Sequence, residues 1–182
     1  MATVSNVSAA KPAVGGAVSV AATSATLPTG TGTSLGTGWT NLGYISEDGL
    51  THSNSPESET IKAWGGDIVL TPMTGKEDTF TFTLIEAINP EVLKLIYGSS
   101  NVSGTLGSGI TVNAKAAEMD AHAWVIDMIL RNNVAKRVVI PNGVISSVGE
   151  VTYADGEAIG YEVTVTAFPN SSDITHYEYI KS

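Results

Sequence analysis

The stretch from Asp78 to Gly98 constrains the fold most, because a clear strand pattern runs directly into a clear helix pattern. Side chains alternate between the two faces of a strand. Three apolar side chains therefore share one face and three hydroxyl side chains share the other: Phe80, Phe82 and Leu84 against Thr79, Thr81 and Thr83. The pattern predicts a strand with one face in a core and one polar face.

A short helix is predicted after this strand, over residues 90–97. Asn89 can accept hydrogen bonds from the free amide groups of the first turn, and Pro90 presets the backbone angle of the first helical residue. Gly98 can end the helix in a left-handed conformation. A narrow apolar stripe follows helical spacing: Val92, Leu93 and Ile96. So short a helix is not stable alone, and we expect it to pack against the sheet.

Most of the remaining chain reads as short strands separated by turns, which indicates an antiparallel β architecture. The dipeptides Asp48-Gly49 and Asn142-Gly143 predict tight hairpin turns. We predict a mainly β fold of two packed antiparallel sheets, a sandwich or barrel, with one short flanking α-helix. Four side chains are predicted to anchor its core: Phe80, Phe82, Leu84 and Trp124.

Two segments do not follow this strand pattern. Residues 1–46 contain one charged residue, Lys11, and are otherwise rich in small and hydroxyl side chains. Residues 53–60 are acidic, contain a proline and have no apolar side chain, so alone they predict a solvated loop. We divide the chain into an arm of residues 1–38 and a single β-sandwich domain of residues 39–182. The arm is either disordered or becomes ordered only against a neighbouring subunit.

No residue pattern indicates catalysis, a metal site or a cofactor, and we expect none of the three. The chain has no cysteine, and its histidines lie far apart without metal-ligand spacing: His52, His122 and His176. The net charge of −9 argues against stable nucleic-acid binding, which needs basic side chains to neutralise phosphates. No apolar run is long enough to span a bilayer.

Four short runs resemble the major tail tube proteins of long-tailed bacteriophages, especially those of Gram-positive hosts. They are LGYISEDG from Leu42, IKAWGG from Ile61, FTLIE from Phe82 and VTVTAFP from Val163. The similarity covers nearly the whole chain in order. It implies two packed sheets with a flanking helix, six copies per ring, and rings stacked into the tube through which the genome leaves the capsid.

The resemblance also implies partners and a location. The partners are other copies of the chain, a tape measure protein inside the tube, tail terminator and tail tip proteins, and DNA in transient passage without sequence-specific contact. A membrane is not among them. Assembly takes place in the host cytoplasm, and the final location is the virion tail. The family provides no catalytic residues to carry over.

Two sets of residues are candidates for these contacts. The polar faces of the two clearest strands are candidates for the lumen wall, because hydroxyl and carboxylate groups offer DNA no cationic grip: Thr79, Thr81, Thr83, Glu162, Thr164 and Thr166. The resemblance places the acidic loop between subunits through Ser55, Pro56, Glu57 and Glu59. The alternative is a secreted or virion-attached β-sandwich that binds carbohydrate or a host surface through Trp39, Trp64 and the glycine-rich loops. An enzyme ranks third.

Overall fold

The computed structural model describes residues 2–13, 15–116 and 118–182 and is mainly β, as the sequence predicts. Its helical elements are α1 (Pro90–Tyr97) and the 3₁₀ turns η1 (Val4–Asn6), η2 (Ser99–Asn101) and η3 (Arg131–Asn133). Its strands are β1 (Ala10–Pro12), β2 (Val18–Ala22), β3 (Thr40–Asn41), β4 (Ile45–Ser58), β5 (Ile61–Lys62), β6 (Ile68–Leu70), β7 (Met73–Leu84), β8 (Val102–Thr105), β9 (Gly109–Val112), β10 (His122–Leu130), β11 (Ala135–Val148), β12 (Tyr161–Ala167) and β13 (Tyr177–Lys181).

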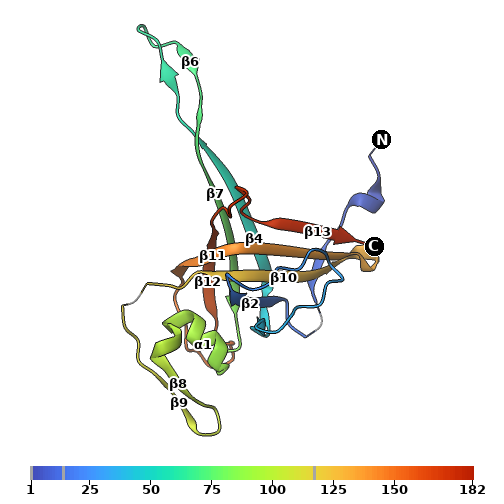
Figure 1. Cartoon of the computed structure of the whole chain (residues 1–182), viewed down its shortest axis with the longest axis vertical. Coiled ribbons are helices and arrows are strands. Elements are labelled where there is room, and N and C mark those ends of the chain that lie inside the picture. The colour runs from blue at the N-terminus through green and yellow to red at the C-terminus, as the bar shows by residue number, and fades with distance from the viewer. Residues whose placement is uncertain (1, 14, 117) are drawn as a thin grey trace.

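One continuous antiparallel sheet carries the fold, with the strand order β3-β2-β10-β11-β12-β7-β4. Strand β1 also pairs with β10, and β13 also pairs with β11. The pairs β5–β6 and β8–β9 form separate two-stranded sheets. Strands β10, β11 and β13 run across β4, β7 and β12, so the two halves of the sheet cross (Figure 1). These halves are the two packed layers of the predicted sandwich.

Strand β11 joins the two halves because it changes partners along its length. Its first part pairs with β10 and β13, and its last part, from Gly143, pairs with β12. The Trp124 indole packs at this corner, and its Nε1 donates a hydrogen bond to the Gly143 carbonyl at 3.0 Å. A Cβ on residue 143 would lie 2.8 Å from Val165 Cγ1. Gly143 therefore permits close packing inside a strand, and the predicted turn at Asn142-Gly143 is wrong.

The turn predicted at Asp48-Gly49 is also wrong. Both residues lie inside β4, beside a shift in its register with β7 between Ile45 and Leu50. Gly49 has a positive φ of 75°, which suits the extra residues of a bulge. Gly49 thus allows a bulge within β4, and Gly143 allows a close contact within β11.

The hydrophobic core lies between the two halves of the sheet. Phe82 of β7 and Trp124 of β10 meet edge to face across it, with ring centroids 6.1 Å apart. All four predicted core side chains are buried there: Phe80, Phe82, Leu84 and Trp124. Full burial of a side chain of this size contributes about 1.5–3 kcal/mol. This core fixes which face of β7 is polar, because neighbouring residues point to opposite faces.

Helix α1 confirms the predicted helix in position and in its Asn89 cap, whereas Gly98 ends it at a φ of 91° and a ψ of 139°, outside the predicted left-handed helical conformation. The Asn89 side chain accepts a hydrogen bond from the Glu91 amide at 3.0 Å. Four side chains bury its apolar face in the core: Val92, Leu93, Leu95 and Ile96. Tyr97 also packs edge to face on Tyr161 of β12.

Part of the expected arm belongs to the sheet. Strand β2 is largely buried and pairs with β10 and β3. The loop between β2 and β3 is held by Arg137 of β11, which donates to the carbonyl oxygens of Gly30 at 3.0 Å and Thr33 at 2.6 Å. The same guanidinium binds Asp127 at 2.6 and 2.9 Å. Met1 and Val14 of the expected arm lie outside the described residues.

Candidate functional site

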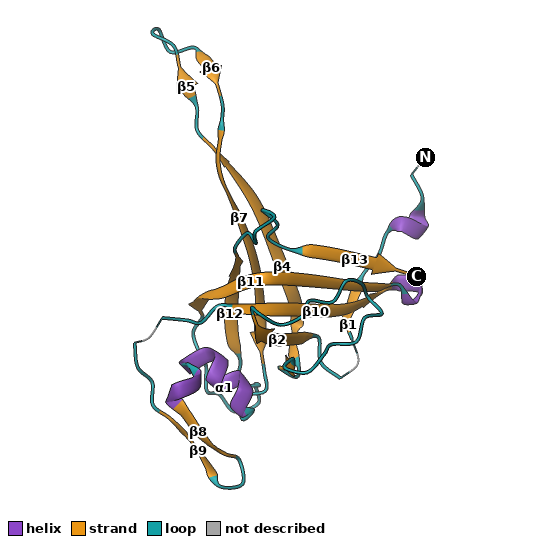
Figure 2. Ribbon diagram, in the orientation of Figure 1, coloured by secondary structure: helices purple, strands orange, loops and turns teal. Residues whose placement is uncertain are grey.

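A long ribbon formed by β4 and β7 projects from the body of the domain (Figure 2). Strand β12 pairs with β7 only from Thr79 to Leu84, so beyond these residues β4 and β7 pair only with each other among the described strands. An isolated two-stranded ribbon is marginally stable in water. The ribbon would therefore gain stability by packing on a partner.

The acidic segment predicted as a loop lies in this ribbon, and the loop prediction is wrong. Ser55, Pro56 and Glu57 pair in register with Glu77, Lys76 and Gly75 of β7. Glu59 follows directly, and its amide donates to the Pro72 carbonyl at 3.1 Å. These residues are exposed on both faces of the ribbon, so no apolar alternation marks them as a strand. Proline is tolerated because β4 is an edge strand.

The tip of the ribbon is apolar and exposed. Strands β5 and β6 close around a turn in which Gly65 and Gly66 take positive φ angles of 115° and 99°. Trp64 at this turn is fully exposed. The exposed apolar side chains near the tip are Ile61, Trp64, Ile68, Val69, Leu70 and Met73. A group of exposed apolar side chains on one projection is typical of a protein interaction site.

The candidate lumen residues lie together on one face of β7 and β12. The register pairs Thr79 with Thr166, Thr81 with Thr164 and Thr83 with Glu162. The hydroxyl oxygens of Thr81 and Thr164 are 3.1 Å apart. The alternating residues of both strands are buried, so this polar face points away from the core. Two strands far apart in the sequence thus build one hydroxyl surface.

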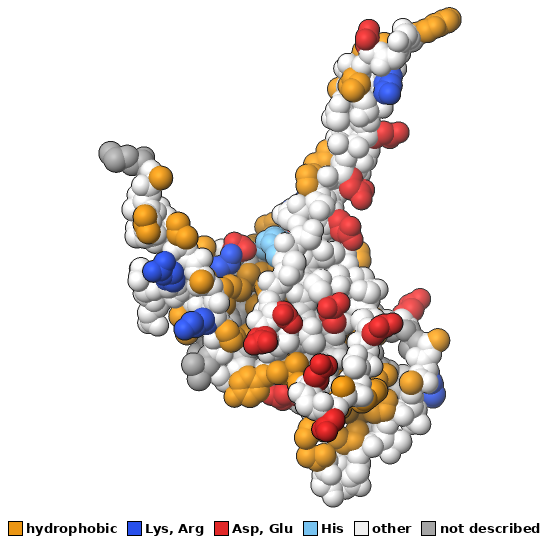
Figure 3. Space-filling model, turned by 180° about the vertical axis from the view of Figure 1, so that it is seen from behind, with side chains coloured by type: hydrophobic (Ala, Val, Ile, Leu, Met, Phe, Trp, Pro, Cys, Tyr) orange, Lys and Arg blue, Asp and Glu red, His pale blue; other side chains and the backbone are white. Residues whose placement is uncertain are grey.

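Charge is unevenly distributed over the rear of the molecule. Acidic side chains follow the ribbon and the adjoining body, whereas most Lys and Arg side chains gather beside the N-terminal segment (Figure 3). The net charge of the chain is −9. The side of the sheet that carries β4, β7 and β12 is therefore surrounded mainly by negative charge.

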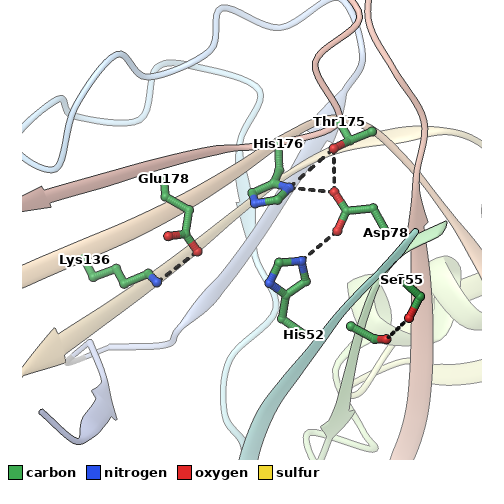
Figure 4. A network of polar contacts seen from close by, with 8 residues as sticks. His52, Ser55, Asp78, Lys136, Thr175, His176 and Glu178 are labelled. Carbon is green, nitrogen blue, oxygen red and sulfur yellow. Dashed lines mark hydrogen bonds and ion pairs between the residues drawn. The ribbon is translucent and has the colours of Figure 1, made fainter. Parts of the chain in front are cut away.

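A polar cluster that the sequence does not predict lies where the ribbon leaves the body (Figure 4). Its centre is the buried carboxylate of Asp78 on β7. His52 Nε2 lies 2.7 Å from Asp78 Oδ1, and His176 Nδ1 lies 2.7 Å from Oδ2. The Thr175 hydroxyl also donates to Oδ2. The His52 ring stacks on Phe80, with ring centroids 4.2 Å apart.

The hydrogen bonds keep the Asp78 carboxyl group ionised. Burial acts to raise its pKa, but hydrogen bonds from Thr175, His52 and His176 outweigh burial and leave the pKa below its usual range. The Thr175 hydroxyl donates to the carboxylate, and His176 Nδ1 lies closer to that carboxylate, at 2.7 Å, than to the hydroxyl, at 3.5 Å, so the cluster is not arranged as a nucleophilic triad. Its donors instead converge on one buried anion.

One sequence signal marks this cluster. Asp78 occupies the same face of β7 as Phe80 and Phe82, and a carboxylate at an inward position requires partners. The histidines that supply them are 26 and 98 residues away, which spacing alone cannot reveal. The third histidine, His122, lies apart and contacts the Asp120 carbonyl at 2.9 Å.

The two tryptophans of the carbohydrate-binding alternative lie on separate elements. Trp39 precedes β3 and donates from Nε1 to the Thr26 carbonyl at 3.3 Å. Trp64 is at the tip of the ribbon. The fold therefore gives this alternative no joint aromatic surface built from the two residues.

The sequence model of a protein family described as "Phage tail tube protein" matches residues 3–182. A search among curated proteins finds no match. Within the part of the chain that the structure describes, no helix is both long and apolar enough to cross a membrane.

Proposed function

Because this chain belongs to the phage tail tube protein family, we propose that it assembles as stacked six-subunit rings that form the conduit for DNA ejection. Membership makes it a structural protein of the virion tail whose subunits associate into a tube. The six-fold ring and the passage of DNA are the finer parts of the proposal. The observation that carries the proposal is the long ribbon with an exposed apolar tip.

The ribbon connects one subunit to another in this proposal. Its tip has no core of its own, and Trp64 is fully exposed, so packing the tip on a neighbouring subunit removes apolar surface from water. A buried tryptophan is a frequent energetic centre of an interface. The acidic stem, with Glu57 and Glu59, lies beside the same contact, and segments of the N-terminal arm complete the contacts between subunits.

The polar face of β7 and β12 lines the lumen in this proposal. Hydroxyl groups at Thr81 and Thr164 present no positive charge to phosphate, and Glu162 adds a negative charge at the end of the face. An acidic wall repels DNA over a Debye length, about 8–10 Å at physiological salt. Weak contact with the wall allows the genome to slide.

The remaining parts of the proposal follow the family resemblance. The tube belongs to a long, non-contractile tail of a phage with a Gram-positive host. A tape measure protein fills it before ejection, and tail terminator and tail tip proteins close its ends. Assembly takes place in the host cytoplasm, and the protein performs no catalysis.

Substitution of Trp64 tests the ribbon contact. Trp64→Ser should leave the melting temperature of the monomer unchanged and prevent tube formation in negative-stain images, because the side chain is exposed in the isolated subunit. Trp64→Phe is the matched control and should still form tubes. In the wild type, polymerisation should shift tryptophan emission to the blue, and Trp64→Phe should lose that shift. Tubes of normal length from Trp64→Ser would refute the ribbon contact.

Two measurements test the other surfaces. Hydrogen exchange should be fast at residues 2–9 and 53–60 in monomers and slow in tubes, whereas equal protection in both states would refute their intersubunit role. Glu162→Lys should permit assembly but slow DNA ejection at low salt, because each added ammonium creates a salt-sensitive attraction to phosphate. Normal ejection at low salt would remove Glu162 from the lumen.

A further inference from the structure

We propose that His52, Asp78 and His176 form a binding site for a divalent transition metal ion of the Zn²⁺ type. The site lies at the base of the ribbon, on β4, on β7 and directly before β13. It is a property of the folded chain and does not depend on the proposed tube function.

The donor atoms have the chemistry and the arrangement that such an ion requires. Two imidazole nitrogens and a carboxylate oxygen lie within 4.8 Å of one another. Imidazole and carboxylate are ordinary Zn²⁺ ligands, at about 2.0–2.2 Å from the metal. Tetrahedral binding separates neighbouring donors by about 3.3 Å at these bond lengths. The nitrogen to oxygen distances of 2.7 Å need to lengthen by a fraction of an ångström. The two histidines contact different oxygens of Asp78, so the widest donor separation, within 4.8 Å, has to shorten by up to about 1.5 Å.

The surrounding side chains hold the ligands in place. Phe80 stacks on His52 with an angle of 2° between the rings, and it meets His176 edge to face at 5.3 Å. Asp78 is buried with three side-chain partners around its two oxygens, so its carboxylate is the group that attracts a cation. Thr175 beside it is a hydroxyl donor to the carboxylate. Ligands fixed by packing and hydrogen bonds lose little freedom when an ion binds.

An ion can reach the cluster from solvent. His52 and Phe80 line a cavity of about 480 Å³ that extends toward β1 and the first part of β4. The nearby Lys136 ammonium is bound to the Glu178 carboxylate at 2.9 Å, so its positive charge is already paired (Figure 4). The side chain of His52 is 28% exposed, which leaves one ligand accessible to a hydrated ion.

A bound ion would connect three segments that are distant in sequence. His52 is 26 residues from Asp78, and His176 is 98 residues from it. The ion would therefore fix the base of the ribbon to the segment that leads into β13. Binding to the native state alone stabilises that state by mass action.

Titration of the full chain, without an affinity tag and after treatment with a chelator, tests the site. Zn²⁺ should bind with one ion per chain in calorimetry, and Co²⁺ should give visible absorption bands of a site with nitrogen ligands. Zn²⁺ at a hundred times its Kd should raise the melting temperature by about 5–10 °C. Mg²⁺ at the same concentration should have no effect, because it prefers oxygen ligands.

Histidine variants locate the ion. His52→Gln and His176→Gln should each weaken Zn²⁺ binding at least tenfold, and His122→Gln, remote from the cluster, should not change it. Nitrogen NMR of the wild type gives the same answer without mutation, since Zn²⁺ should shift the ring signals of His52 and His176 but not those of His122. Absence of one-to-one binding, or binding that survives both cluster variants, would leave only a hydrogen-bonded clamp and overturn the proposal.

Discussion

Gly143→Ala should destabilise the domain because an added methyl group has no room at the corner of β11. Its Cβ would lie 2.8 Å from Val165 Cγ1 and 2.9 Å from both Cδ1 and Nε1 of Trp124. The φ angle of residue 143 is outside the left-handed region, so alanine can adopt the backbone conformation without strain. The clash with Val165 and Trp124 is therefore the cause of the expected loss.

The size of this loss follows from two contributions. Forcing an extra carbon into a well-packed core costs about 1–3 kcal/mol. Displacement of the indole also weakens the hydrogen bond from Trp124 to the Gly143 carbonyl, worth about 1 kcal/mol. The sum of about 2–4 kcal/mol corresponds to a fall in melting temperature of about 4–16 °C for a domain of this size.

Differential scanning calorimetry measures the effect, and Gly107→Ala is the matched control. A Cβ on residue 107 meets no atom within 4 Å, so this variant should melt at the wild-type temperature or slightly above it. If Gly143→Ala melts within about 1 °C of the wild type, the close packing at the corner of β11 is refuted.

The variant Asn142→Val distinguishes the observed strand from the hairpin turn that the sequence predicts. In a type I′ turn, valine would be strained at a positive φ and would lower the melting temperature. In the strand, valine removes the Asn142 Oδ1 atom, which is buried without a hydrogen-bond partner among the described residues. An unsatisfied acceptor of this kind costs about 1–3 kcal/mol. The melting temperature should therefore stay equal or rise, and a clear fall would contradict the observed strand.

Three further outcomes are expected. Phe82→Ala should lower the free energy of unfolding, measured with denaturant, by about 3–5 kcal/mol and prevent assembly, because the Phe82 side chain is buried opposite Trp124. Wild-type stability of this variant would place β7 outside the core. Because the pKa of Asp78 is lowered in the folded state, its contribution to the free energy of unfolding is fully present above about pH 3.8 and is lost as the pH falls through the folded-state pKa. The stability of Asp78→Asn should therefore fall less steeply than that of the wild type below about pH 3.8. Arg137→Met should lower the free energy of unfolding by about 1.5–3 kcal/mol and expose the loop of residues 23–39 to proteases. Wild-type protease resistance of this loop would show that Arg137 does not hold it.

Local patterns in the sequence were sufficient for one part of the fold. The alternation of Phe80, Phe82 and Leu84 identifies the core face of β7 because it depends only on neighbouring residues. The same holds for α1, whose cap at Asn89 and end at Gly98 are encoded within ten or so positions. These elements are correct in type and in position.

Other parts depend on contacts that the sequence does not express. The stem of the ribbon has no buried face, so residues 53–58 show no strand alternation and gain their conformation from pairing with β7. The dipeptide Asn142-Gly143 suits a hairpin turn as well as a strand position that leaves room for the Trp124 ring. Only the packing of Trp124 and Val165 against Gly143 distinguishes these two structures. Likewise, His52 and His176 approach Asp78 only after the sheet has formed.

A cryo-EM reconstruction of the polymerised protein tests the proposed assembly into a tube. The reconstruction should show a tube of stacked six-subunit rings, with the Trp64 tip of each ribbon buried against a neighbouring subunit and the Thr81 and Thr164 face toward the lumen. A tube whose ribbon tips remain in solvent, or a concentrated protein that stays monomeric, would contradict the proposal.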